Sequence, residues 1–376
     1  MTIHAWSHGV AKMKALSSTV AVDISSDTKR TNTQVAVRSL EPAQSAAWDE
    51  FVYQHPEASF FHLTGWMRAI AKTFRYSPRY LFAERDHRIT GVLPLFETSN
   101  WLQGKCLIST PMAVYGGIAA EDEESHFALL HAAKQLAQAE NVQHLELRNR
   151  QGEPLPEFHS NNLYTTFYGE LDPDPEVLLR RLPRDTRYMI RKAQKKCLEV
   201  VRGLDQTSAF YGLFAQSMRR LGTPAFPLRL FENLNEEFKS LVDVTVLSSS
   251  NGPVAAVFSF RFRDTIIPYY AGASEEAPAL AANNLLYWEL MTRSAAEGMR
   301  WFDFGRSKKG TGAYAFKTQW NMTAQPLAYQ LYLVRRKNVP NFTPLNPKFE
   351  RAGRIWRKLP LGLTTLLGPH IVRWFP

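Results

Sequence analysis

The sequence is poor in cysteine and has no long apolar run. Its two cysteines, Cys106 and Cys197, are too few for a disulfide framework, and neither has a cysteine or histidine partner at metal-ligand spacing. No apolar stretch reaches the ~18 residues that a transmembrane helix needs. The N-terminal segment ALSSTVAV is short and interrupted by polar residues, unlike a signal peptide. These absences predict a protein of the reducing cytoplasm that holds no metal.

The standard catalytic signatures are also absent. The sequence has no G-x-S-x-G elbow, no Walker loop and no H-E-x-x-H motif, and its ten histidines are scattered. Hydrolase, kinase and metalloenzyme functions are therefore disfavoured. No recognised nucleic-acid-binding module is present, so DNA is not an expected partner.

Positive charge, by contrast, is concentrated in two segments of a chain whose net charge is +10. Residues 180–196 contain eight basic residues and one acid, and residues 335–376 contain nine and one. Such concentration of positive charge implies an anionic partner. The candidates are a nucleic acid, a phosphorylated substrate and a lipid surface. In the second segment the cations alternate with Trp356, Leu363 and Trp374, which indicates a basic amphipathic tail.

The order of predicted elements indicates two domains of mixed α/β structure in the 376 residues. In each half, a strand–turn–strand unit and a long helix precede a strand with one acid between two hydrophobic residues. These acids, Glu146 and Asp303, are 157 positions apart (303 minus 146), which indicates duplication of one unit. We expect a flexible leader over residues 1–35, a first domain over 36–171, a second, catalytic domain over 172–335, and the tail over 336–376. The first domain would end with LYTTFYGEL, before two prolines near residue 173.

The segment WFDFGRSKKGTGAYAFKTQW, residues 301–320, is the main candidate for chemistry. It combines a cationic glycine-rich loop after a strand with an aromatic turn that presents one lysine, and such an arrangement can hold a phosphate or a developing oxyanion. The alternatives are a mobile surface turn for the loop and a solvated lysine beside core aromatics for Lys317. The candidates here are Asp303, Arg306, Lys308, Gly310, Phe316 and Lys317.

Other candidates lie outside this segment. Arg187 and Arg191 belong to a cationic stripe at helical spacing, which is either a solvated face or a contact for phosphate or membrane. Tyr269 and Tyr270 would point to opposite faces of a regular strand, so we expect only one of them, with Tyr270 as the candidate, to line a cleft. Tyr115 precedes two glycines that permit close approach of a substrate or form a tight bend. Asp303 would either orient a substrate amine or pair with Arg306.

The string NNLLYWELMTRSAAEGMRWFDFGRSKKGTGAYAFKTQWN, residues 283–321, resembles the second half of FemAB-related proteins. More narrowly, it resembles the branch associated with exosortase and PEP-CTERM protein-sorting systems in bacteria that produce exopolysaccharide. The likeness continues through FFHLTGW, GVLPLFE, AVYGGIA, LELRNR, LPRDTRYMIRKAQK, PYYAGA and LGPHIV, and spans about residues 40–372.

This resemblance implies a pair of GNAT-like domains, the fold of the general N-acetyltransferases. Characterised FemAB relatives move amino acids from aminoacyl-tRNA onto the peptide of a peptidoglycan precursor. Their Phe-Lys pair near the transferred group matches Phe316 and Lys317. Arg306 and Lys308 lie in the corresponding loop, and the two arginines at positions 187 and 191 match a basic helix motif by residue type.

Two departures from the family pattern leave the donor open. The chain lacks the long helical arm that some FemAB proteins insert in the second domain, and it lacks the R/Q-x-x-G-x-G/A loop that binds coenzyme A pyrophosphate in GNAT enzymes. The corresponding helix start reads ALAANN, residues 279–284. Aminoacyl-tRNA and acyl-CoA both remain candidate donors, and we expect no tightly bound cofactor.

The leading hypothesis is an acyl- or aminoacyl-transferase acting on an anionic cell-envelope precursor: an exopolysaccharide, a lipid-linked sugar or a peptidoglycan peptide. Lys317 would neutralise charge as the ester or thioester opens. The rival hypothesis is a non-catalytic adaptor that binds a glycan or an anionic membrane through the same fold. Peripheral contact at the inner membrane is compatible with both hypotheses.

Overall fold

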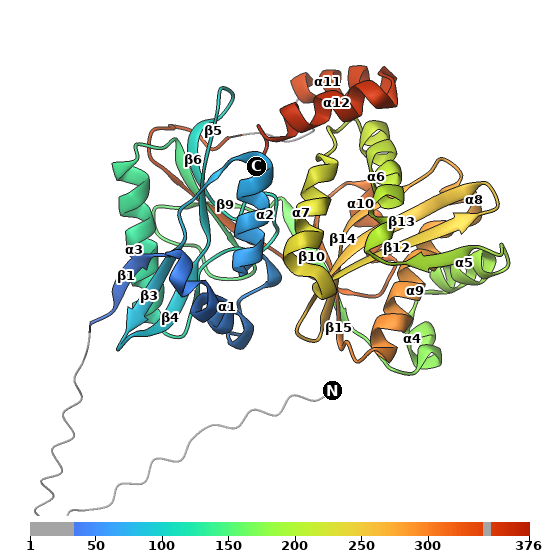
Figure 1. Ribbon diagram of the computed structural model, residues 1–376, viewed down its shortest axis with the longest axis horizontal. Helices are drawn as coiled ribbons and strands as arrows, with labels where there is room; N and C mark the ends of the chain where they lie inside the picture. Colours follow the sequence, from blue (N-terminus) through green and yellow to red (C-terminus); the bar gives the residue numbers. More distant parts are fainter. Residues whose placement is uncertain (1–33, 341–346) are drawn as a thin grey trace, which may run out of the picture. The chain divides into compact units, whose positions relative to one another are not determined.

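The computed structural model describes residues 34–340 and 347–376 (Figure 1). The predicted leader, residues 1–35, lies outside these ranges apart from its last two positions. Residues 35–376 form one compact unit. Within the described ranges, no helix is both long and apolar enough to cross a membrane.

Two sheets occupy the first half of this unit. One is antiparallel with the strand order β1-β3-β4-β7, and the other has the order β2-β5-β6-β8-β17-β9. Helix α3 begins after Asp122, whose carboxylate accepts the backbone N–H of Ser125 at 2.8 Å as an N-cap. The strands are β1 (Ala36–Ser39), β2 (Ser77–Pro78), β3 (Leu81–Arg85), β4 (Arg88–Leu93), β5 (Leu95–Asn100), β6 (Gly104–Ser109), β7 (Ala119–Ala120), β8 (His144–Asn149), β9 (His159–Asn161) and β17 (Ala328–Leu333); the helices are α1 (Ser45–Gln54), α2 (Thr64–Phe74) and α3 (Glu123–Ala139).

A seven-stranded sheet with the order β11-β12-β13-β14-β15-β10-β16 organises the second half. Helices α6 and α7 pack on one face of it, and α4, α5 and α9 pack on the other (Figure 1). The strands are β10 (Tyr164–Glu170), β11 (Glu199–Arg202), β12 (Val242–Ser249), β13 (Gly252–Phe262), β14 (Thr265–Ala273), β15 (Trp301–Lys308) and β16 (Thr323–Pro326). The helices are α4 (Pro175–Arg181), α5 (Arg184–Gln194), α6 (Thr207–Leu221), α7 (Leu228–Phe238), α8 (Ala277–Leu280), α9 (Ala282–Ala296) and α10 (Gly312–Thr318).

The two halves repeat one arrangement at their centres. In the first, α3 leads into β8, which pairs parallel with β6 through Leu145 and Leu107. In the second, α9 leads into β15, which pairs parallel with β14 through Phe302 and Ile266. These parallel strands carry the acid-between-hydrophobes pattern found in the sequence, and the expected mixed α/β fold is confirmed.

The halves also exchange strands. β10, which the sequence pattern placed at the end of the first half, pairs with β15 and β16 in the seven-stranded sheet. β17, which follows all of the second half's strands, returns to pair with β8 and β9. Side-chain periodicity predicts a strand but not its partner, so this exchange was not visible in the sequence. The halves also share a continuous aromatic core, in which the Phe60 and Phe260 rings lie 4.3 Å apart between centroids.

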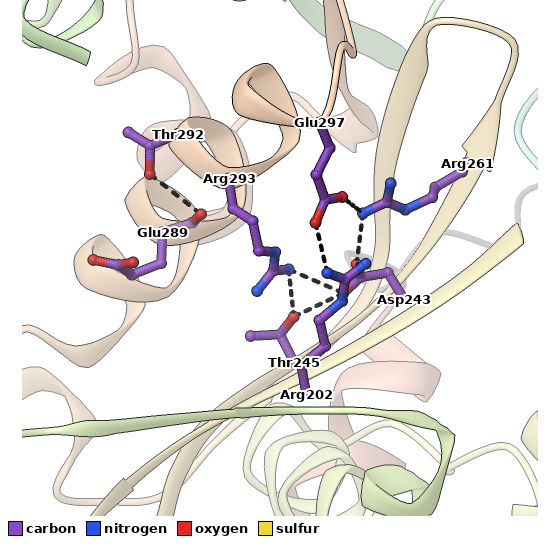
Figure 2. Close-up of polar contacts among 8 residues, drawn as sticks. All are labelled: Arg202, Asp243, Thr245, Arg261, Glu289, Thr292, Arg293 and Glu297. Carbon is purple, nitrogen blue, oxygen red and sulfur yellow. Dashed lines mark hydrogen bonds and ion pairs between the residues drawn. The ribbon is translucent and has the colours of Figure 1, made fainter. Parts of the chain in front are cut away.

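An ion cluster around one buried carboxylate joins α9 to this sheet (Figure 2). Asp243 on β12 has a fully buried carboxylate that pairs with Arg202 at 2.9 Å and with Arg261 and Arg293 at 3.0 Å. Glu297, just after α9, pairs with Arg202 at 2.6 Å and also with Arg261. The cluster thus links β11, β12 and β13 to the C-terminal end of α9. The same helix carries Tyr287, which belongs to the candidate functional site described below.

Candidate functional site

A cavity opens where β14 and β15 separate. The two strands pair only over Thr265–Ile266 and Trp301–Phe302, and they diverge beyond these residues. The cavity, pocket 1, has a volume of about 280 Å³. Both halves of the chain and its C-terminal segment contribute to the lining, which consists of Met112, Val114, Phe226, Pro268, Tyr269, Tyr270, Tyr287, Phe304, Gly305, Arg306, Lys317, Phe375 and Pro376.

The first half contributes a loop over residues 110–117. Arg148 holds this loop by donating from Nη1 to the carbonyls of Thr110 at 3.1 Å and Ala113 at 3.2 Å. Further along the loop, the hydroxyl of Tyr269 donates to the carbonyl of Met112 at 3.0 Å. The loop is therefore fixed from both halves of the chain.

The two glycines after Tyr115 belong to the same loop. A Cβ on Gly116 would lie 1.8 Å from Thr110 Oγ1, and a Cβ on Gly117 would lie 1.7 Å from Asn149 Oδ1. Both positions are closed by the protein itself. Close packing within the protein therefore requires glycine at both positions. Both glycines also line the second cavity described below, so approach of a substrate there stays a prediction.

A β-bulge brings two adjacent tyrosines into pocket 1. Phe258 on β13 faces Tyr270, and Ser259 faces Pro268, so Tyr269 has no partner in the ladder. Such a bulge breaks the alternation of side chains. The expectation that only one of the two tyrosines lines a cleft is therefore wrong, because it assumed a regular strand.

Lys317 is fixed at the wall of pocket 1 by the end of β15. Its Nζ donates to the carbonyls of Phe304 at 2.6 Å, Gly305 at 3.0 Å and Arg306 at 3.1 Å. Three consecutive carbonyls can face one ammonium group because Gly305 adopts a left-handed conformation with φ of 64°. These bonds use all three N–H donors of the lysine.

Burial lowers the pKa of Lys317 to about 8, although nearby Asp303 favours its charged form. Lys317 is thus mostly protonated at pH 7. Arg306 adds a second, permanent positive charge to pocket 1. Its guanidinium lies over the Tyr164 ring at 4.7 Å and donates to the hydroxyl of Tyr329 at 3.3 Å. The pocket therefore favours a ligand that carries or develops negative charge.

Asp303 lies behind this wall and is almost fully buried. Its Oδ1 accepts hydrogen bonds from the backbone N–H of Gly305 at 2.8 Å, the hydroxyl of Tyr115 at 3.1 Å and the hydroxyl of Thr166 at 3.2 Å. Its Oδ2 lies 3.6 Å from Arg150. The alternative in which Asp303 pairs with Arg306 is not observed. The pairing of β15 with β10 shifts register between these two residues, and the Arg306 guanidinium contacts Tyr164 and Tyr329 instead.

Arg150, the partner of Asp303, lines a second and larger cavity. The guanidinium lies 5.1 Å from the ring centroids of both Tyr115 and Tyr168. This cavity, pocket 2, has a volume of about 1200 Å³ and is also lined by Phe127 and Gln325. Asp303 therefore contacts residues of both cavities, namely Gly305 of pocket 1 and Tyr115 and Arg150 of pocket 2. Tyr115 lines pocket 2 and not pocket 1.

Several candidates from the sequence lie outside pocket 1. Lys308 is the last residue of β15, and Gly310 belongs to the turn that precedes α10. Phe316 packs against Tyr287 at 5.4 Å between ring centroids. On α5, Arg187 donates to the carbonyl of Leu182 at 2.9 Å and so caps the end of α4, whereas Arg191 is exposed.

Sequence reasoning missed other residues that build the two cavities. Tyr287 reaches pocket 1 from α9, and burial raises its pKa to about 12. Arg148 and Arg150 lie at the end of β8 and just beyond it, within the motif LELRNR. Two arginines two residues apart at a strand end were a signal in the sequence for a functional role. Their partners, however, are in loop 110–117 for Arg148 and on β15 for Arg150, and sequence spacing does not reveal such contacts.

Comparisons with known proteins agree with this architecture. Residues 184–318 match the family described as an acetyltransferase (GNAT) domain. FemX has a similar structure with a TM-score of 0.63 and 15% identity, covering 80% of this chain and 98% of FemX. The C-terminal domain of a candidate lysylphosphatidylglycerol synthetase from Agrobacterium fabrum follows with a TM-score of 0.52, 12% identity and coverage of 78% and 92%.

A tandem GNAT protein from the clavulanic acid biosynthesis pathway is also similar, with a TM-score of 0.50, 10% identity and coverage of 81% of this chain and all of that one. Among curated protein sequences, no significant match exists. At these identities the structural likeness shows the fold. Residues 184–318, which include β14, β15 and Lys317, therefore match the GNAT acetyltransferase family, and the fold of the chain resembles those of FemX and a tandem GNAT protein.

Proposed function

We propose that this protein transfers an acyl or aminoacyl group from an activated donor to an amine or hydroxyl of a cell-envelope precursor. Pocket 1 receives the carbonyl that is transferred. The observation that carries this proposal is the fixed cation of Lys317 beside Arg306 at the point where β14 and β15 separate, within the GNAT-like region.

In the reaction, the acceptor attacks the donor's ester or thioester carbonyl. A tetrahedral intermediate forms with negative charge on oxygen, and then the bond to the leaving oxygen or sulfur breaks. Lys317 and Arg306 would stabilise that charge electrostatically in a partly buried site. All three N–H donors of Lys317 already bond to backbone carbonyls. Lys317 therefore stabilises the oxyanion through the electrostatic effect of its charge, unless one N–H leaves its carbonyl and bonds to the oxyanion.

Asp303 is best described as a positioning residue. Its Oδ1 already accepts from Gly305 and Tyr115, so it holds the wall of pocket 1 to the loop of the first half. We therefore assign it no proton transfer. The acceptor's proton would pass to substrate or water.

The volume of pocket 1 limits what it can take. About 280 Å³ is at the lower end of the range for small-molecule sites, so only the acyl end of a donor fits. The rest of an aminoacyl-tRNA or acyl-CoA would lie outside, where the exposed cations of α5 are available. Thr186 on α5 donates to the carbonyl of Gln319 at 2.6 Å, which places this basic helix beside α10. The donor's identity stays open between these two classes.

Envelope chemistry for the acceptor is favoured by the likeness to FemX and to the candidate lysylphosphatidylglycerol synthetase. Pocket 2, with its stacked guanidinium and aromatic lining, is a suitable place for a polar acceptor. Membership of the exosortase and PEP-CTERM branch, and with it an exopolysaccharide acceptor, rests on the sequence motifs alone.

A donor comparison tests the proposal. The protein is incubated with a crude envelope-precursor fraction and either labelled aminoacyl-tRNA or labelled acyl-CoA, and label in the acceptor fraction is measured. Transfer from one donor is expected. No transfer from either donor, together with retained binding of envelope glycan, would favour the adaptor alternative instead.

A further inference from the structure

The C-terminal helices expose an unusual amount of apolar surface. They are α11 (Pro347–Lys358) and α12 (Leu361–Val372), which lie beside α6 (Figure 1). Among the described residues, the large hydrophobic side chains with more than a third of their surface exposed include four from these two helices. They are Ile355 at 65%, Leu363 at 40%, Leu366 at 66% and Leu367 at 38%.

The packing of α12 explains why its leucines remain outside. Thr364, Gly368 and Val372 recur every four residues and form the buried stripe. A Cβ at Gly368 would lie 2.9 Å from the carbonyl oxygen of Ala225, so this stripe is already closely packed. The leucines at 363, 366 and 367 lie on the opposite face, away from the rest of the protein.

Positive charge accompanies these hydrophobic residues, mainly on α11. Residues 347–376 contain six basic residues and one acid. Arg351, Arg354, Arg357 and Lys358 are exposed on α11 around Ile355. A neighbouring aromatic extends the surface: Trp101, which is 76% exposed at the β5–β6 turn, stacks edge-on with Trp374 at 5.3 Å between ring centroids.

We propose that α11, α12 and Trp101 form a docking surface for an anionic lipid bilayer. Exposed leucine, isoleucine and tryptophan side chains would enter the interfacial region while the arginines contact lipid phosphates, the combination typical of helices that lie in a membrane surface. Each helix has 12 residues, which is too short to span a bilayer. The excess of cations favours a lipid surface over a second copy of this basic chain.

Docking would bring pocket 1 close to the lipid. Phe375 and Pro376 line that cavity and follow Val372 by only three and four residues, so they lie within about 14 Å of the end of α12. Arg148 donates from Nη2 to the carbonyl of Pro376 at 2.9 Å, and Gln103 donates to the carbonyl of Trp374 at 2.6 Å. If the proposed transfer is correct, this placement favours a lipid-linked acceptor. The choice of acceptor thus rests on the proposed function, whereas the docking of the C-terminal helices on a bilayer does not.

Vesicle flotation tests the docking surface. The full chain is mixed with vesicles of phosphatidylcholine containing phosphatidylglycerol, or of phosphatidylcholine alone, at fixed salt. We expect binding to the anionic vesicles, a loss of about tenfold or more for Leu363→Asp/Leu366→Asp, and a similar loss for Arg351→Glu/Arg354→Glu. Val200→Asp, which alters a side chain on β11 that is about as exposed (39%) as Leu363, should bind as the wild type does.

Circular dichroism checks that each variant is folded. Lys317→Ala should bind vesicles as the wild type does, and this result would show that docking is independent of the proposed transfer. Equal binding by the leucine variant and the wild type would overturn the proposal. So would the absence of vesicle binding combined with a dimer that the same leucine substitutions dissociate, because the occupant would then be a second copy of the chain.

Discussion

At the scale of single residues, the charge of Lys317 decides how the site responds to pH. Burial lowers its pKa to about 8, so its protonated form is present below that value and is lost as the pH rises through it. If transfer uses this charge, the rate of single-turnover transfer should fall above about pH 8. Lys317→Ala should remove that decline and leave only slow transfer. The same decline in the variant would show that another group titrates.

Gly305 supplies the backbone turn that gathers three carbonyls around Lys317. Its φ of 64° is unfavourable for any residue with a Cβ, although the space around it is open, with the nearest atom at 3.9 Å. Gly305→Ala should therefore lower the free energy of unfolding by about 1–2 kcal/mol, measured by urea denaturation.

Gly212→Ala is the matched control for this change. Gly212 lies within α6, has open space around it and is not left-handed, so alanine should stabilise the helix by about 0.5–1 kcal/mol. Equal effects at both glycines would contradict the role given to the conformation of Gly305.

At the scale of elements, the cluster around Asp243 fastens α9 to three strands, and α9 carries Tyr287 into pocket 1. Asp243→Ala would leave three arginines without their buried acid. We expect a loss of about 3 kcal/mol in the free energy of unfolding, at the lower end of the range for such a deletion because Arg202 reaches solvent. Chemical denaturation measures it.

Glu124→Ala provides the comparison. Glu124 lies on α3 and is an exposed partner of Arg85 on β3, so its removal should lower the free energy of unfolding by less than about 1 kcal/mol. A similarly small loss for Asp243→Ala would mean that the cluster does not hold α9 in place.

The elements also show what the sequence could predict. The helices and the paired motifs around Glu146 and Asp303 follow from periodicity and repetition, which are local signals. The exchange of β10 and β17, the bulge at Tyr269 and the pairing of Arg150 with Asp303 depend on contacts between distant segments. Resemblance drew attention to Lys317, but only the structure places its ammonium against three carbonyls.

At the scale of the whole molecule, pocket 1 depends on both halves and on the C-terminal segment. Loop 110–117, the diverging strands β14 and β15, and Phe375 each supply part of its wall. The GNAT-like region 184–318 therefore contains Lys317 but not the complete cavity. The exchange of β10 and β17 matters for the site because it joins the two halves that together form the wall of pocket 1.

The most direct test of the proposed transfer compares three proteins with whichever donor supports it. Label transferred to the envelope acceptor is measured for wild type, Lys317→Ala and Lys134→Ala, the last removing a lysine of α3 that pairs with Glu157. We predict a loss of about a hundredfold or more for Lys317→Ala, with its fold intact, and a near-normal rate for Lys134→Ala. A near-normal rate for Lys317→Ala would contradict the account of this site.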